Sequence, residues 1–140
     1  MSAFVIDASV AVKWFFPEIH SQAAGRILKS RQKLLAPDLI WDEVGNTLWK
    51  KNLRQEITPE ESSGILKDFL RFPLEIYVSK ALLDTALGLA VEYKITVYDG
   101  LYLALAIGCG CFLVTADRKF YESLPEKIIG KQLIWVEDIK

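Results

Sequence analysis

The sequence has few of the residues from which several common kinds of functional site are built. Among its 140 residues there are one histidine and two cysteines, and no Gly/Ser-rich linker, low-complexity tract or internal repeat divides it. No apolar run approaches the roughly 18 residues that a membrane-spanning helix needs. The N-terminus also lacks the charged and apolar regions of a secretory signal. We therefore expect a single domain, residues 1–140, in the cytoplasm and without a membrane partner.

The scarce residues also exclude particular chemistries. His20 is the only histidine, so RNA cleavage by two histidines acting as acid and base is excluded, and we expect His20 on the surface at a helix start. Cys109 and Cys111 are separated by one glycine, which is too tight for an unstrained disulfide, and we interpret them as small reduced core residues. The net charge of −1 argues against a nonspecific nucleic-acid coat but leaves room for a local basic stripe.

Hydrophobic residues make up 51% of the chain and are grouped into short runs. Short apolar runs that stop at a polar residue are typical of strands buried in a parallel sheet. Five strands are expected, at 3–6, 33–37, 74–78, 111–114 and 131–136. Helices are expected at 8–16, 19–31, 38–54, 58–72, 79–93 and 98–108, with Ser79 as the cap of the fifth. This alternation predicts an α/β fold, an open parallel sheet with helices on both faces.

Four acidic residues stand at strand ends or helix starts. Asp7 and Asp117 each follow a buried strand, Glu43 lies one turn into a helix, and Asp99 opens an almost wholly apolar helix. Ligands of open α/β sheets bind beyond the carboxyl ends of the strands, so these acids are predicted to meet in one crevice. Such carboxylates repel one another, and a site made only of oxygen ligands selects Mg²⁺ or Mn²⁺. The implied reaction is metal-dependent hydrolysis of a phosphodiester.

These residues also have ordinary structural interpretations. Glu43 suits the first turn of a helix, where the helix dipole favours an acid, and Asp99 suits a helix cap. Tyr98 and Tyr102 can stack on a base or simply pack. Ser9 either caps the first helix or adds a hydroxyl group to the site.

Four segments together resemble a known family. They are VIDASV at 5–10, P-x-L-x-W-x-E-V-x-N-x-L at 37–48, YDGLYLALA at 98–106 and TADRKFY at 115–121. Through them essentially the whole chain resembles the PIN domain, and more closely the VapC-type ribonuclease toxins of toxin–antitoxin pairs. The resemblance implies a three-layer α/β/α fold with sheet order 3-2-1-4-5 and a Mg²⁺-dependent RNA endonuclease. It also implies a homodimer and inhibition by a cognate antitoxin protein.

The family's acidic quartet carries over onto the four acids, and its supporting threonine onto Thr115, which can donate a hydroxyl hydrogen bond to a carboxylate. The expected catalytic and metal-binding residues are therefore Asp7, Glu43, Asp99 and Asp117. The expected supporting residues are Thr115, Ser9 and Asn46, and the expected RNA-binding residues are Lys50, Arg54, Arg118 and Lys119.

Two positions depart from the family pattern. Gly100 stands where alanine is frequent, and we treat this as an exchange of one small residue for another. Lys119 stands where relatives are often acidic, so we expect one tightly held ion rather than two. We also expect two of the aromatic residues 14–16 in the core and one partly exposed. Together with Trp41, they form the surface that we expect an antitoxin tail to cover.

Two other classes of protein compete with a nuclease. A PIN-like module that binds RNA or protein without cleavage would tolerate loss of the acids, yet all four are present. A phosphatase with an aspartate nucleophile needs a second aspartate where Ser9 stands. A phospho-receiver needs an aspartate after the third strand, where the chain has Ser79.

Overall fold

The first strand, β1 (Ala3–Ile6), runs through the middle of a five-stranded parallel sheet. The structure is a computed structural model and describes residues 3–140. β1 pairs with β2 on one side and with β4 on the other, which gives the order β3-β2-β1-β4-β5. The remaining strands are β2 (Lys33–Pro37), β3 (Glu75–Tyr77), β4 (Phe112–Thr115) and β5 (Leu133–Trp135). The predicted α/β fold and strand order are confirmed.

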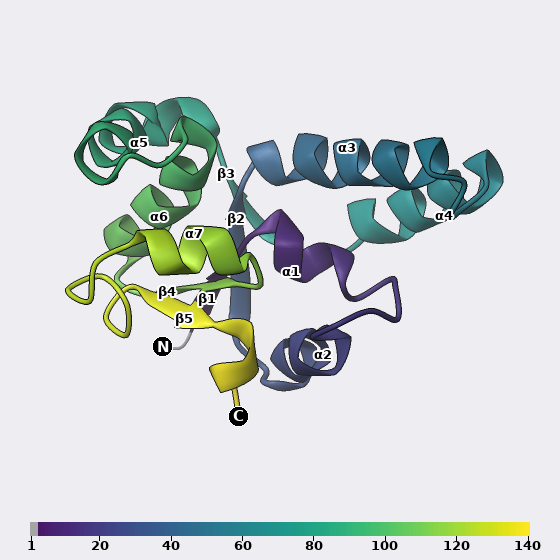
Figure 1. The fold of residues 1–140 in the computed structure, drawn as a ribbon, viewed down its shortest axis with the longest axis horizontal. Coiled ribbons are helices and arrows are strands. Elements are labelled where there is room, and N and C mark those ends of the chain that lie inside the picture. The colour runs from purple at the N-terminus through teal and green to yellow at the C-terminus, as the bar shows by residue number, and fades with distance from the viewer. Residues whose placement is uncertain (1–2) are drawn as a thin grey trace.

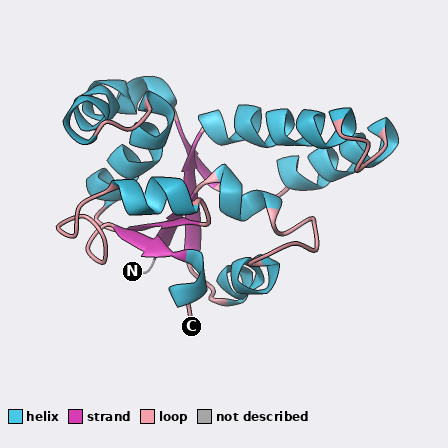
Figure 2. Ribbon diagram, in the orientation of Figure 1, coloured by secondary structure: helices cyan, strands magenta, loops and turns pink. Residues whose placement is uncertain are grey.

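Helices cover both faces of this sheet (Figures 1 and 2). α5 and α6 lie on one side of β2 and β3, and α1 to α4 lie on the other, with α3 and α4 projecting as a hairpin. The helices are α1 (Ala8–Val12), α2 (Ser21–Lys29), α3 (Leu39–Leu53), α4 (Pro59–Leu70), α5 (Ser79–Tyr93), α6 (Val97–Cys109) and α7 (Arg118–Ser123), followed by the 3₁₀ helix η1 (Val136–Asp138). Among residues 3–140, no helix combines the length and apolar character needed to cross a bilayer.

The core follows from the apolar runs of the sequence. Val5 and Ile6 of β1 are fully buried, as are Leu113 and Val114 of β4, because helices cover both faces of the sheet. α6 is buried from Gly100 to Ala106, so this nearly all-apolar helix lies inside the protein.

The helix after β1 is shorter than predicted. α1 ends at Val12 instead of Phe16, because three consecutive aromatic side chains cannot all face the core from one helix. Once the chain has left the helix, Trp14 stacks on Phe72 with 4.7 Å between ring centroids. All three aromatics are half-buried, so the expected division into two core residues and one partly exposed residue is wrong. The other predicted boundaries agree within two residues, and α7 and η1 were not expected.

Local predictions for Ser79 and for the two cysteines are also corrected. Ser79 does not cap α5: its hydroxyl and its backbone N–H both donate to the carboxylate of Asp38, which lies at the end of β2. Cys109 is exposed and Cys111 is half-buried. Both lie at the junction between the end of α6 and the start of β4, where Gly110, with φ of 64°, turns the chain. His20 does stand at the start of α2, but its ring is held by Glu137, with Nδ1 2.7 Å from Oε2.

Gly100 allows α5 and α6 to approach closely. A methyl group at this position would lie 2.6 Å from the backbone oxygen of Ala86 on α5. Glycine and alanine are therefore not interchangeable here, contrary to the interpretation from sequence. This contact matters for the site because α6 carries Asp99 next to Gly100.

We predict that Gly100→Ala destabilises the protein although alanine favours helices. Overpacking costs roughly 1–3 kcal/mol, against a gain of about 1 kcal/mol in helix propensity. Gly88→Ala, on α5, is the matched control because a methyl group there meets nothing within 4 Å. We expect that control to raise the free energy of unfolding by about 0.5–1 kcal/mol. Urea unfolding of both variants is the measurement, and equal gains for both would contradict the close contact.

Candidate active site

Asp7 and Asp117 follow the ends of two neighbouring strands. β1 pairs in parallel with β4, with Ile6 beside Val114, so both strands end at the same edge of the sheet. Each aspartate is the N-cap of the helix that follows, α1 for Asp7 and α7 for Asp117, and accepts a backbone N–H there. Asp7, rather than Ser9, therefore caps the first helix.

The carboxyl group of Asp7 is buried, with 7% of the residue exposed, and is fully hydrogen-bonded. Ser9 Oγ donates to Oδ1 at 2.5 Å, Thr115 Oγ1 donates to Oδ2 at 2.5 Å, and Val10 N donates to Oδ1 at 3.2 Å. The hydrogen bond expected from Thr115 to a carboxylate is thus present. Burial nevertheless raises the pKa of Asp7 to about 7, because these hydrogen bonds do not offset the loss of water and the nearby negative charge of Asp99 also favours the protonated form.

Ser9 and Thr115 also connect the two strand ends to each other. Ser9 Oγ accepts the backbone N–H of Ala116 at 3.0 Å, and Thr115 Oγ1 accepts that of Asp117 at 3.1 Å. The loops after β1 and β4 are therefore held in one hydrogen-bonded unit, with the carboxyl group of Asp7 at its centre.

Asp99 is presented to this unit from the first turn of α6. Its backbone N–H is capped by Thr96 Oγ1 at 3.0 Å. Burial, together with the negative charges of Asp117 and Glu43, raises the pKa of Asp99 to about 6. The structure thus brings Asp99 within electrostatic reach of the other three acids.

Glu43 is held by Tyr102, a residue whose role was not recognised from the sequence. The phenol donates to Glu43 Oε1 at 2.6 Å, and Tyr102 is only 2% exposed. Burial raises the pKa of Glu43, and this hydrogen bond counteracts the rise. The available signal was spacing, because Tyr102 lies three residues after Asp99 and so occupies the same face of α6.

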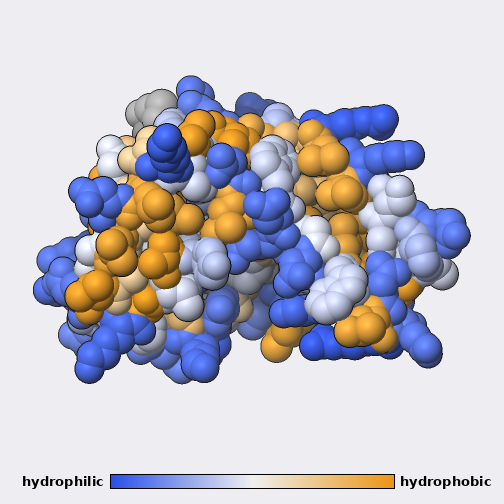
Figure 3. All heavy atoms as spheres, turned by 90° about the horizontal axis from the view of Figure 1, so that it is seen from above, coloured by the Kyte–Doolittle hydropathy of each residue, from blue (hydrophilic) through white to orange (hydrophobic). Residues whose placement is uncertain are grey.

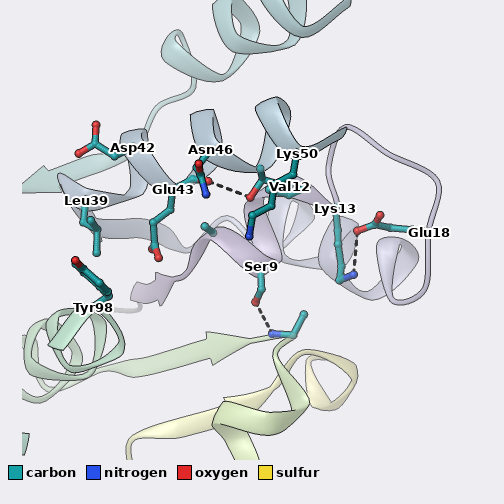
Figure 4. Close-up of a pocket in the computed structure, with 13 residues that line it drawn as sticks. Ser9, Val12, Lys13, Glu18, Leu39, Asp42, Glu43, Asn46, Lys50 and Tyr98 are labelled. Carbon is teal, nitrogen blue, oxygen red and sulfur yellow. Dashed lines mark hydrogen bonds and ion pairs between the residues drawn. The ribbon is translucent and has the colours of Figure 1, made fainter. Parts of the chain in front are cut away.

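A pocket of about 770 Å³ opens beside these acids (Figure 4). α3 forms one wall, from which Glu43 and Lys50 project into the pocket, and Ser9 lies opposite. Tyr98 and Leu39 close one end, and Lys13, paired with Glu18, closes the other. The remaining lining residues are Ala8, Val12, Asp42, Asn46, Thr47 and Ala116.

A second, smaller pocket lies next to the first. Asp99, Asp117 and Lys119 line it, so Lys119 shares this pocket with two of the acids. Two other expected RNA-binding residues lie elsewhere. Arg54 is the C-cap of α3, outside both pockets, and Arg118 packs on the ring of Trp135 at 4.0 Å.

The donor chemistry of the site fits a hard divalent cation. The acids offer oxygen ligands, and a cation near them would relieve the repulsion that raises the pKa of Asp99. Within residues 3–140, no three Asp, Glu, His or Cys side chains are close enough to hold one ion among them. Mg²⁺ does not require such a cage, because it keeps several waters and is usually bound by one or two carboxylates.

Comparisons with known proteins point in one direction. A model of the PIN domain matches residues 4–123. Ribonuclease VapC3 of Pyrobaculum aerophilum is 36% identical over 86% of this chain and 94% of its own length. The crystal structure of PAE2754 from the same organism has a TM-score of 0.73 at 27% identity, over 97% of this chain and 85% of that one. A toxin–antitoxin complex from Klebsiella pneumoniae, at 18% identity and a TM-score of 0.63 over 95% and 96%, shares the fold.

We predict that Asp7→Asn stabilises the protein at neutral pH when divalent cations are absent. Folding raises the pKa of Asp7 from its ordinary 3.8 to about 7, so the folded state binds this proton more tightly than the unfolded state. The contribution of this proton to the free energy of unfolding is fully present below about pH 4 and is lost as the pH rises through 7. In EDTA at pH 8, the free energy of unfolding of the variant should exceed that of the wild type by on the order of 4 kcal/mol, with little difference at pH 4. Urea unfolding across this range is the measurement. If Asp7→Asn were less stable than the wild type by the same amount at both pH values, the prediction would be wrong.

We also predict that Tyr102→Phe raises the pKa of Glu43 further. The substitution removes a hydrogen bond to the ionised carboxylate and should cost about 1–2 kcal/mol of stability at pH 7. Carbon-detected NMR titration of the Glu43 carboxyl group measures the pKa directly. Tyr98→Phe is the control, because Tyr98 is exposed and its hydroxyl does not contact Glu43. An unchanged Glu43 pKa in Tyr102→Phe would show that the hydrogen bond does not hold the carboxylate.

Proposed function

This chain belongs to the PIN domain family, and we propose that it is a ribonuclease that hydrolyses RNA phosphodiesters with the help of Mg²⁺ or Mn²⁺. One observation carries the proposal: the buried carboxyl group of Asp7 accepts a hydrogen bond from Ser9, which lines an open pocket, and lies within electrostatic reach of Asp99, and burial raises its pKa. Such an arrangement costs stability at neutral pH, which is typical of a functional site rather than of a structural one. The name of the relative VapC3, a ribonuclease, supports the same activity.

The four acids would share the work of binding and proton transfer. Asp7, Asp99 and Asp117 would hold the cation, and Glu43 would serve as a ligand or as a base. A bound Mg²⁺ or Mn²⁺ ion supplies charge stabilisation at the phosphate and lowers the pKa of a water molecule. Tyr102 occupies Oε1 of Glu43, so a proton would be accepted at Oε2. Ser9 and Thr115 would keep Asp7 in place, and Asn46 would support the site from α3.

We further propose that a cognate antitoxin protein regulates this activity in the cytoplasm. The toxin–antitoxin complex from Klebsiella pneumoniae supports this through its shared fold. Trp14 and Trp41 are half-buried rather than fully buried, so part of each ring is open to a partner. A homodimer is also proposed. Leu83, Leu87 and Val91 form an exposed apolar stripe on α5, seen on the left of Figure 3, and such patches mark interaction surfaces.

The test is cleavage of a structured RNA by the purified protein. We expect cleavage with Mg²⁺ or Mn²⁺, none with EDTA, and products that carry 5′-phosphate ends. Asp7→Asn should lower the rate by roughly 100-fold or more. Asp84→Asn, an exposed acid on α5, is the matched control and should keep wild-type activity.

Two outcomes would overturn the proposal. Cleavage that survives EDTA would show a different mechanism or a contaminating nuclease. A folded protein that cleaves no RNA with either metal would favour the alternative, a PIN-like module that binds RNA or protein without cutting it.

A further inference from the structure

Two thiols lie at the far end of α6 from the acidic site. Cys109 is the last residue of α6 and Cys111 directly precedes β4, with Gly110 between them. Asp99, in the first turn of the same helix, lies roughly 15 Å away from Cys109 along the helix axis. The function proposed above uses neither cysteine. Cys109 and Cys111, here called the thiol pair, are therefore available for a chemistry of their own.

A tight turn holds the thiol pair together. Gly110 adopts the left-handed conformation, with φ of 64°. Cys111 N donates to the carbonyl oxygen of Ala106 at 3.0 Å and Gly110 N to that of Ile107 at 3.2 Å, which is the pattern of a Schellman turn. The α-carbons of residues two apart in a chain are separated by at most roughly 7 Å, and a turn shortens this distance.

This spacing suits a disulfide that is easily broken again. Disulfides join residues whose α-carbons are roughly 4.4–6.8 Å apart, and the turn at Gly110 places the thiol pair in that range. A ring closed over a single intervening residue is strained, and strain makes a disulfide easier to reduce. The thiol pair therefore has the geometry of a reversible disulfide rather than of a permanent one.

The two thiols differ in their access to solvent. Cys109 is exposed, whereas Cys111 is half-buried. Burial and the neighbouring Cys109 both raise the pKa of the Cys111 thiol, which lowers the share of its reactive thiolate form. The space beside the turn is open, because a methyl group at Gly110 would meet no atom of residues 3–140 within 4 Å beyond the adjoining chain. A reagent in solution therefore reaches Cys109 first.

We propose that the thiol pair is a modification site for low-molecular-weight disulfides such as oxidised glutathione. The Cys109 thiolate attacks one sulfur of the reagent, which breaks the S–S bond of the reagent, joins one half to Cys109 and releases the other half as a thiol. The sulfur of Cys111 then attacks that of Cys109, which forms the Cys109–Cys111 disulfide and releases the second half. Both cysteines are oxidised, one disulfide is reduced to two thiols, and the two protons of the cysteines leave on those thiols.

The reaction is followed by intact-mass spectrometry of the reduced, full-length protein in excess oxidised glutathione, with an acid quench and subsequent labelling by N-ethylmaleimide. We expect a transient adduct with one glutathione, and then a product that carries no glutathione and takes up no N-ethylmaleimide. Cys111→Ser should stop at the adduct with one glutathione. Cys109→Ser should react on the order of tenfold more slowly, because its remaining thiol is half-buried and less ionised.

Unfolding in urea provides the matched control. There the fold no longer distinguishes the two thiols, so we expect Cys109→Ser and Cys111→Ser to react at nearly equal rates. Equal rates in the folded variants, or no reaction of the folded wild type, would overturn Cys109 as the point of attack. A wild type that retains one glutathione or takes up two would overturn the disulfide. This last result needs no substitution, so it decides the proposal even if a serine variant fails to fold, and it is independent of any cleavage of RNA.

Discussion

The hydrogen bonds that Ser9 and Thr115 donate to the buried carboxyl group of Asp7 are the contacts on which the site depends. They join the end of β1 to the end of β4, two central strands whose side chains fill the core. The positions of α1 and α7, both capped by aspartates of this unit, follow from them. Every other residue of the site is placed relative to this junction.

The same junction works against the stability of the chain. Asp7 loses water on folding, and its hydrogen bonds do not fully replace it, so the carboxyl group is held in its protonated form well above its ordinary pKa. Asp99 and Glu43 bring further negative charge to the same edge. A chain selected for stability alone would replace these acids with neutral residues, so their presence is best understood as a cost of function.

Several local interpretations failed where a neighbour distant in sequence decided the outcome. Ser79 has the chemistry of a helix cap, but Asp38, which follows the adjacent strand β2, accepts its hydrogen bonds instead. In the sequence Gly100 looks replaceable by any small residue, but the backbone of α5 leaves no room there for a side chain.

By itself the sequence determined the strands, most of the helices and the presence of four acids at their ends. It could do so because the periods of strands and helices, turn residues and caps are local properties. The strand order was inferred from resemblance and confirmed by the pairing. Only the tertiary structure decided that Tyr102 on α6 holds Glu43 on α3 and that Glu137 of η1 holds His20 at the start of α2. Hydrogen bonds and ion pairs between separate helices depend on distances of a few ångströms, and no local pattern encodes those distances.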